Sequence, residues 1–424
     1  MIRKIIIACI CLTSVGVYAQ NSTVSPYSYF GIGDLKATGT VENQMMGGLS
    51  VYADSIHLNL NNPAAYSKLR LTTYTAGLSR KEFSLVGNTS KDNASVSNLD
   101  YLALGFSLGK GFGLGFGIMP YSSVGYNFRS DRTVPGQGEV QEIFTGKGGL
   151  NRVYASLGYQ VLKDFSIGAT ANFNFGTQNT NSMQTVEGLQ FGSFDRVSSR
   201  INGFDFNFSA NFNPTIKQKY TLFTSVIVNT QANLVSRNTR SIGSFSIANG
   251  SDMEVIEVDL EGRGLARTGV QVPTTTTLGV GFGEDKKWFL GTEYSFQELS
   301  NFRNELSPAS NLEYKNAGTF RFGGFYIPDY ASFTNYFKRV VYRAGARISK
   351  SGIVVDDREI NDFGITFGLG LPLGQGINFS NVNIGFELGR RGTKYGDLVE
   401  ENYFKINLGL SLSDIEWFQK RKIN

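Results

Sequence analysis

Residue types that could perform catalysis are scarce in this chain of 424 residues, which contains 1 histidine and 2 cysteines. A hydrolase serine needs a neighbouring base, and the single histidine, His57, lies outside the segments that read as strands. The acidic pairs at 356–357 and 400–401 fall in predicted loops without a ligand pattern around them. The glycines of 111–115 alternate within a predicted strand and do not join a strand to a helix, so they are not a nucleotide-binding loop. We therefore predict a protein that is not an enzyme, with no metal and no cofactor.

The composition excludes further classes. A formal charge of +5 is small for this length, and no dense block of Lys and Arg precedes the last few residues, so nucleic acid is not an expected partner. The hydrophobic and charged fractions, 41% and 18%, are too ordinary for a disordered chain. The 50 glycines, 33 phenylalanines and 20 tyrosines instead favour a protein built from sheets.

The first nineteen residues are typical of a secretory signal peptide. Arg3 and Lys4 form a basic start, an apolar core follows at 5–17, and a small-residue cleavage site ends at Ala19. The apolar core is too short for a membrane-spanning helix, which needs about 20 residues. A lipoprotein cleavage box at 6–9 is disfavoured because it lies too near the start. Both cysteines leave with the signal, so we expect an exported mature chain without cysteines.

Strict alternation of apolar and polar residues dominates the rest of the chain. At 203–212 the even-numbered positions are Phe or Ala and the odd positions after Gly203 are Asp, Asn or Ser, and 403–412 alternates similarly. Further alternating segments lie at 112–118, 167–175, 363–371 and 382–388. Since strand side chains point to opposite faces in turn, each segment has one apolar face and one polar or glycine face.

Two architectures give this pattern. A soluble sandwich buries the apolar face in a core, whereas a membrane barrel turns it to lipid. The segments run to about 10–14 residues, longer than the usual 5–6 of soluble strands. Their polar faces are rich in glycine and asparagine, which suits a crowded interior. The gaps between segments also alternate between short and long, as the periplasmic turns and extracellular loops of outer-membrane barrels do.

The gaps give a strand count. Short gaps fall at 110, 162–163, 214–216, 285, 327–336 and 373–376. Long gaps fall at 81–97, 128–149, 179–199, 232–269, 298–315, 351–360 and 391–400, and within 232–269 a strand-like stretch, Ser241–Ala248, is assigned to a hairpin in the loop. The sequence therefore predicts an all-β transmembrane antiparallel barrel of about fourteen strands.

Residues 20–67 do not alternate and precede the first strand as a tail, plug or linker. Together with the preceding arguments they divide the chain into a signal peptide at 1–19, an N-terminal hatch or plug at 20–67, a barrel at 68–413 and a periplasmic tail at 414–424.

Short motifs at both ends resemble the FadL-type outer-membrane transporters of hydrophobic compounds, as found in Bacteroidetes. They are Ser25–Asp34 (SPYSYFGIGD), Met46–Gly48, Asn62–Ala64, and the C-terminal stretches 401–412 and 417–418. The resemblance implies a fourteen-stranded barrel, a hatch that carries the Asn-Pro-Ala motif, and a kink in the third strand that opens the wall sideways. It also implies a Gram-negative outer membrane, in Bacteroidetes, as the location of this multi-pass protein. Some members serve as subunits of larger machines, so the fold alone leaves the function open.

Four residues become candidates for the hatch and gate: Asn62, Pro63, Ala64 and Pro120. The Asn-Pro-Ala motif could equally be a turn into the first strand. Pro120 lies in the third predicted strand, where it cannot donate a ladder hydrogen bond, so a bulge or kink is expected at 119–122. Alternatively, Pro120 only ends the membrane portion of that strand.

Charged residues predicted to face the lumen form the second candidate set: Asp205, Glu293, Arg321, Arg343, Arg347 and Glu387. The favoured interpretation is a salt-bridged wall that ties the strands to the hatch. The sharper alternative is that the three arginines attract a carboxylate or a lipid headgroup, which guanidinium groups bind well. His57 could be a pH-dependent latch, but a structural role is favoured.

Two function classes remain. The first is passive uptake of hydrophobic, fatty-acid-like molecules through a hatch-gated lumen and a lateral opening, with the molecule and the outer-membrane lipids as partners. Inward apolar positions such as Phe223, Phe289 and Phe325 favour such a passage. The second is a non-transporting accessory or scaffold subunit of an outer-membrane assembly or secretion complex, with other outer-membrane or surface proteins as partners. A lumen filled by the hatch and by ion pairs would favour the second.

Overall fold

The computed structural model describes residues 22–88, 90–136, 138–306, 312–374, 380–396 and 398–414. The signal peptide predicted at 1–19 and nearly all of the tail predicted at 414–424 lie outside these residues. Among the described residues, no helix is long and apolar enough to cross a membrane.

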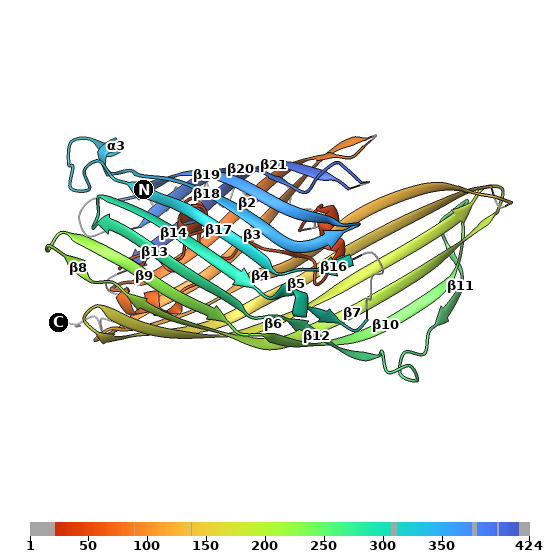
Figure 1. The fold of residues 1–424 in the computed structure, drawn as a ribbon, viewed down its shortest axis with the longest axis horizontal. Coiled ribbons are helices and arrows are strands. Elements are labelled where there is room, and N and C mark those ends of the chain that lie inside the picture. Colours follow the sequence, from red (N-terminus) through yellow and green to blue (C-terminus); the bar gives the residue numbers. More distant parts are fainter. Residues whose placement is uncertain are drawn as a thin grey trace, which may run out of the picture.

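Fourteen antiparallel strands form a closed barrel (Figure 1), which confirms the predicted fold class. Six of these are unbroken: β2 (Thr72–Val86), β3 (Lys91–Gly109), β4 (Phe112–Val134), β5 (Gly138–Leu162), β6 (Phe165–Val186) and β7 (Phe191–Phe212). Four are interrupted: β9 and β10 (Tyr220–Asn229, Ala232–Ser246), β12 and β13 (Arg267–Val272, Thr275–Glu284), β14 and β15 (Trp288–Gln297, Arg303–Asn304), and β16 and β17 (Leu312–Tyr314, Ala317–Tyr326). The last four are β18 (Val341–Val355), β19 (Arg358–Pro372), β20 (Asn381–Arg391) and β21 (Glu400–Asp414). Pairing of β2 with β21, from Thr72 opposite Asp414 to Val86 opposite Glu400, closes the wall.

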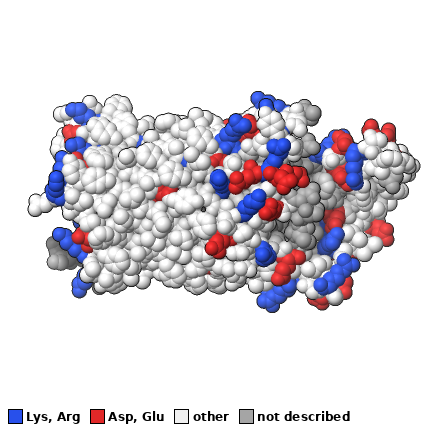
Figure 2. Space-filling model, viewed as in Figure 1, with Lys and Arg blue, Asp and Glu red and all other residues white. Residues whose placement is uncertain are grey.

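The outward face of the wall is apolar, as the alternation predicts. Phe204, Phe206 and Phe208 on β7 are 61%, 46% and 49% exposed, whereas Asp205 between them is buried. Figure 2 shows, on the face in view, a broad band with few charged residues between a group of charges at the left end and a larger group toward the right end. This band matches the lipid-facing belt of an outer-membrane barrel.

The short turns predicted at 110, 162–163, 214–216 and 285 are present to within a few residues, and the one predicted at 373–376 lies partly outside the described residues. Several predicted long loops are wrong. Residues 128–149 and 179–199 belong mostly to β4, β5, β6 and β7, which contain 22 to 25 residues each and are joined by short turns. A membrane-spanning strand needs about 9–11 residues, so these strands continue well beyond the bilayer. The alternation of apolar and polar residues ends there because the outer face contacts water and not lipid. The backbone hydrogen bonds between neighbouring strands continue.

These continued strands form a sheet that projects from the right-hand end of the barrel in Figure 1, farther than β17–β21. The predicted hairpin near Ser241–Ala248 is part of it: β10 pairs with β11 (Asp252–Glu257) from Ser241 opposite Glu257 onward. At the opposite end of the barrel, the turns at 110–111, 163–164 and 285–287 contain two or three residues each, and the first wall strand begins and the last wall strand ends there. This is the periplasmic end of an outer-membrane barrel, so the projecting sheet lies on the extracellular side.

The segment before the first wall strand lies inside the barrel as a hatch. It contains the 3-10 helices η1 (Pro26–Tyr29) and η2 (Pro63–Lys68), the short strand β1 (Asp34–Leu35) and the helix α2 (Val41–Gln44). Many of its apolar side chains, including Val41, Met45 and Tyr66, are almost fully buried and pack with wall residues such as Tyr101 and Tyr154.

Glycines on the inward face of the wall allow the hatch backbone to approach closely. A Cβ atom on Gly168 would lie 2.3 Å from the backbone nitrogen of Ala64, and one on Gly113 would lie 1.8 Å from the carbonyl oxygen of Tyr66. Any other residue at these positions would push η2 away from the wall. The glycine-rich inner face read from the sequence is therefore the surface against which the hatch packs.

The wall is interrupted beside Pro120. Strands β3 and β4 pair only as far as Leu102 opposite Ile118, and beyond this point they separate. The register between β4 and β5 shifts between Pro120 and Ser122, which is the bulge expected at this position. The hatch strand β1 pairs with the freed edge of β4, placing Asp34 opposite Ser123.

The remaining short elements lie in turns and loops. The strand β8 (Thr215–Ile216) lies in the connection between β7 and β9, the helix α3 (Tyr336–Arg339) lies in the connection between β17 and β18, and the 3-10 helix η3 (Leu299–Asn301) lies between β14 and β15.

Candidate functional site

The lumen and its hatch form the candidate site. The predicted motif Asn62-Pro63-Ala64 begins η2 and is buried against β6 and β7. The Asn62 side-chain amide donates to Oδ1 of Asn211 at 2.9 Å, and the Ala64 backbone nitrogen donates to Oγ of Ser209 at 2.7 Å. The motif is thus bonded directly to the barrel wall.

A second attachment joins the hatch to β14. The carboxylate of Glu293 accepts hydrogen bonds from the backbone nitrogen of Ser50 at 2.6 Å, from its hydroxyl at 3.0 Å, and from the backbone nitrogen of Val51. The Glu293 side chain is 2% exposed. A buried carboxylate satisfied by hatch N–H groups holds this loop with charge-assisted bonds.

An aromatic cage holds a third point of the hatch. The Tyr52 ring lies 5.2, 4.8 and 5.0 Å from the ring centres of Phe223, Phe289 and Phe325. These three phenylalanines were the inward apolar positions that favoured an apolar passage in the sequence. In the structure the hatch fills the space between them.

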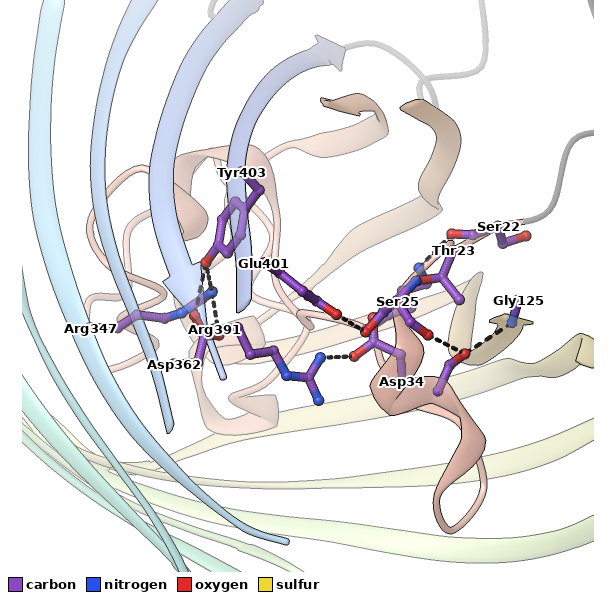
Figure 3. A network of polar contacts seen from close by, with 12 residues as sticks. Ser22, Thr23, Ser25, Asp34, Gly125, Arg347, Asp362, Arg391, Glu401 and Tyr403 are labelled. Carbon is purple, nitrogen blue, oxygen red and sulfur yellow. Dashed lines mark hydrogen bonds and ion pairs between the residues drawn. The ribbon is translucent and has the colours of Figure 1, made fainter. Parts of the chain in front are cut away.

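Figure 3 shows a fourth attachment, between the start of the hatch and β20 and β21. The Arg391 guanidinium lies 2.5 Å from the Asp34 carboxylate, and the hydroxyl of Ser25 donates to Glu401. On the other side, the backbone nitrogen of Gly125 on β4 donates to the Ser28 hydroxyl at 3.1 Å. The start of the hatch therefore connects β4, which comes early in the sequence of the barrel, to β20 and β21, which come last.

The predicted lumen charges are all inward and all have protein partners. Arg321 donates to Ser295, Arg343 donates to Asn383 at 2.9 Å, and Arg347 lies 2.8 Å from Asp362. Two acidic members complete ion pairs: Asp205 lies 2.7 Å from Arg152, and Glu387 lies 3.0 Å from Arg347. Of the three arginines, Arg347 forms ion pairs, whereas Arg321 and Arg343 donate to the neutral side chains of Ser295 and Asn383.

The single histidine forms an ion pair within the hatch. Nδ1 of His57 lies 2.5 Å from Asp54, and Nε2 lies 4.0 Å from Glu42. Burial lowers the pKa of His57, but the charge and hydrogen bond of Asp54 outweigh it, so the net pKa is raised. Burial likewise opposes the lowering of the Asp54 pKa, which the His57 charge produces. His57 thus links two acidic hatch residues.

A cavity of about 530 Å³ remains in the lumen beside the hatch and extends to Pro120 at the break in the wall. Its charged lining comes from hatch and wall alike: Asp34, Lys36, Lys81, Asp100, Arg152, Asp205, Glu293, Arg321, Arg347, Lys350, Asp362, Glu387, Arg391 and Lys405. Within the described ranges, no cluster of three His, Cys, Asp or Glu residues could hold a metal ion.

Several residues that attach the hatch to the wall were not predicted as site residues, although Ser25, Asp34 and Glu401 lie in the motifs that resemble the FadL-type family. Asp34, Arg391, Ser25 and Glu401 were not among the candidates, since their partners lie more than 350 residues away in the chain. Tyr52 was also missed. The alternation could have placed Glu401 on the inward face of β21 together with Tyr403, but nothing local indicates which hatch residue faces it.

Comparisons with known proteins agree with the fold. The toluene transporter TbuX of Ralstonia pickettii has a TM-score of 0.59 and 12% identity, over 90% of this chain and 99% of TbuX. The toluene transporter TodX of Pseudomonas putida has a TM-score of 0.58 and 15% identity, over 91% and 99% of the two chains. A FadL homologue of Pseudomonas aeruginosa has a TM-score of 0.55 and 13% identity, over 90% and 98%. The fold is therefore FadL-like, as the sequence motifs implied.

No curated protein matches the chain. The BamG family model, in contrast, matches residues 1–424, the whole length of the sequence. This chain, a FadL-like outer-membrane barrel with an internal hatch, belongs to the BamG family.

Proposed function

We propose that this protein is a non-transporting accessory subunit of a multi-protein outer-membrane assembly, and that it works by docking partner proteins. The observation that carries the proposal is the hatch, which is attached to the wall at β4, β7, β14, β20 and β21 through buried hydrogen bonds and ion pairs. Opening the lumen would require several of these buried polar contacts to break together. Membership of the BamG family supports the accessory role as well.

The lining of the cavity also supports this proposal. An apolar molecule inside it would displace water from the charged side chains of wall and hatch without offering hydrogen bonds in return. Burying polar groups without partners costs about 1–3 kcal/mol each in proteins. Apolar side chains such as Phe83, Ile227 and Phe302 share the lining with these charges, so the cavity has a mixed surface, whereas a passage for hydrophobic molecules would be expected to place few charges along the ligand's path.

The projecting extracellular sheet supplies a surface for a partner. Large apolar side chains are exposed on both faces of its end, where the β6–β7 turn meets the β10–β11 hairpin through a hydrogen bond from the Ile247 nitrogen to the Gln190 oxygen. They are 37% to 59% exposed: Leu189, Phe191, Ile242, Ile247, Met253, Val255 and Ile256. Apolar patches in water, away from the bilayer, mark protein interaction sites. We call these seven residues the tip patch.

Affinity purification in mild detergent tests the proposal. We expect the wild-type protein to co-purify with outer-membrane or surface proteins, and we expect Phe191→Ser, Met253→Ser and Val255→Ser together to reduce that yield at least tenfold. Their matched control is Asn127→Ser, Thr133→Ser and Glu139→Ser, which changes exposed polar residues of the same sheet and should retain the partners. Recovery of the barrel alone from wild-type cells, or full partner yield from the tip variant, would contradict the proposal.

Passive uptake of small hydrophobic molecules is the second candidate. It is favoured by the separation of β3 and β4 beside Pro120, because a lateral gap next to the cavity offers an exit into lipid. In this mechanism the ligand displaces the hatch around Asn62, Pro63 and Ala64 and leaves beside Pro120, driven by its partition into the bilayer.

The motifs at the chain ends also support a Bacteroidetes origin for the protein under either function.

A further inference from the structure

The connection between β17 and β18 is unusual among the turns at the periplasmic end. It spans residues 327–340, whereas the β3–β4, β5–β6 and β13–β14 turns contain two or three residues each. Figure 1 shows this connection, with α3, at the margin of the barrel outline at the left end. We call residues 327–340 the aromatic loop, after Tyr330, Phe333, Tyr336 and Phe337.

Neighbouring turns hold the aromatic loop in place. The Ile327 backbone nitrogen donates to the Lys287 oxygen at 2.7 Å, and the Tyr336 hydroxyl donates to the Pro372 oxygen at 3.1 Å. The Asn335 side chain caps α3 by accepting from the Phe337 nitrogen. The aromatic loop is therefore held in one conformation with a defined outer surface.

Two phenylalanines on this built loop point into open space. Phe333 is 84% exposed and Phe337 is 71% exposed, more than any other large apolar residue among those described. The Phe337 carbonyl accepts from the hydroxyl of Tyr342, a lipid-facing residue at the start of β18 that is 38% exposed. The two phenylalanines therefore lie close to the interface between membrane and water, where aromatic side chains of membrane proteins contact lipid headgroups.

The surroundings of the loop are basic. The aromatic loop and the neighbouring turns at 213–219 and 284–287 contain six basic residues, Lys217, Lys219, Lys286, Lys287, Lys338 and Arg339, and three acidic ones, Glu284, Asp285 and Asp329. Lys338 is exposed and follows Phe337 directly. A positive rim beside exposed aromatic side chains is complementary to an anionic lipid surface.

We propose that the aromatic loop is a lipid anchor that inserts Phe333 and Phe337 among the headgroups of the periplasmic leaflet, with the basic rim selecting anionic phospholipids. This interaction involves the outer edge of the barrel and is independent of what the lumen does. It would fix the rotation and depth of the barrel in the membrane.

Tryptophan quenching by brominated lipid tests the anchor. The native Trp288 and Trp417 are replaced by Phe, and Phe333→Trp is introduced into this background. The matched control is Leu189→Trp, which places an exposed tryptophan on the β6–β7 turn at the extracellular end. In vesicles of phosphatidylcholine with brominated phosphatidylglycerol, we expect quenching at Phe333→Trp to be at least twice that of the control. Quenching equal to the control would overturn the proposal.

Two further arms separate the alternatives. Brominated phosphatidylcholine at the same mole fraction should quench Phe333→Trp less than brominated phosphatidylglycerol does. Adding Lys338→Gln should narrow the difference between the two lipids. Equal quenching by the two lipids in Phe333→Trp without Lys338→Gln overturns the anionic selectivity. If Phe333→Trp is unquenched, and Phe333→Ala loses a co-purifying periplasmic protein from cells, the loop is a protein docking site and the lipid anchor is wrong.

Discussion

Glu293→Ala is expected to release the hatch from β14. The substitution leaves the buried backbone N–H groups of Ser50 and Val51 without an acceptor, and each buried unpaired group costs about 1–3 kcal/mol. With loss of the Ser50 hydroxyl contact, the free energy of local hatch unfolding should fall by about 3–5 kcal/mol. The measurement is the rate at which a maleimide labels Leu49→Cys, a fully buried hatch position in a mature chain expected to lack cysteines.

Labelling should accelerate by about 100-fold or more, since each 1.4 kcal/mol is a factor of ten in an opening equilibrium. Glu293→Gln keeps one acceptor oxygen and should give an intermediate rate. Glu139→Ala removes an exposed extracellular carboxylate and serves as the control. An unchanged labelling rate in Glu293→Ala would show that this contact does not hold the hatch.

Arginine on the lipid-facing surface is expected to destabilise the whole barrel. Phe206→Arg or Leu408→Arg should each lower the free energy of unfolding by about 2–4 kcal/mol if these residues lie near the middle of the bilayer. Phe206 and Leu408 are 46% and 42% exposed, on β7 and β21, and both belong to the outward apolar face. Urea-dependent folding into lipid vesicles measures the change.

The control places the same charge on the projecting sheet. Val255→Arg on β11 lies beyond the bilayer and should leave the free energy of unfolding nearly unchanged. Wild-type stability of both membrane variants would mean that the assignment of lipid-facing and lumen-facing residues is inverted.

The wall of the barrel could be predicted from the sequence because the signals are local. The alternation around Phe206 assigns each side chain to one face, and Pro120 marks the irregular position of β4 from its chemistry alone. The projecting sheet was missed for a physical reason: a strand with water on its outer face has no need for apolar residues there, so 128–149 looks like a loop. Only the pairing between β4 and β5 reveals it.

The hatch contacts could not be predicted in the same way. Ser50 and Glu293 are 243 residues apart, and Ser25 and Glu401 are 376 residues apart, so no spacing rule connects them. The inward glycines were the indirect signal, since Gly168 and similar positions only make sense beside a second backbone. They show that something packs against the wall, without showing what.

In the proposed function the hatch remains closed while the protein performs its role, and a reversible disulfide lock tests this. Ala64→Cys with Ser209→Cys joins η2 to β7, where the Ala64 nitrogen and the Ser209 hydroxyl are 2.7 Å apart, and a mass shift on reduction verifies the disulfide. We predict that cells with the oxidised lock retain wild-type partner yield and wild-type uptake of a monoaromatic hydrocarbon. Uptake that is lost on oxidation and recovered on reduction, while Ser209→Cys alone behaves as wild type, would contradict the claim and establish the barrel as a transporter.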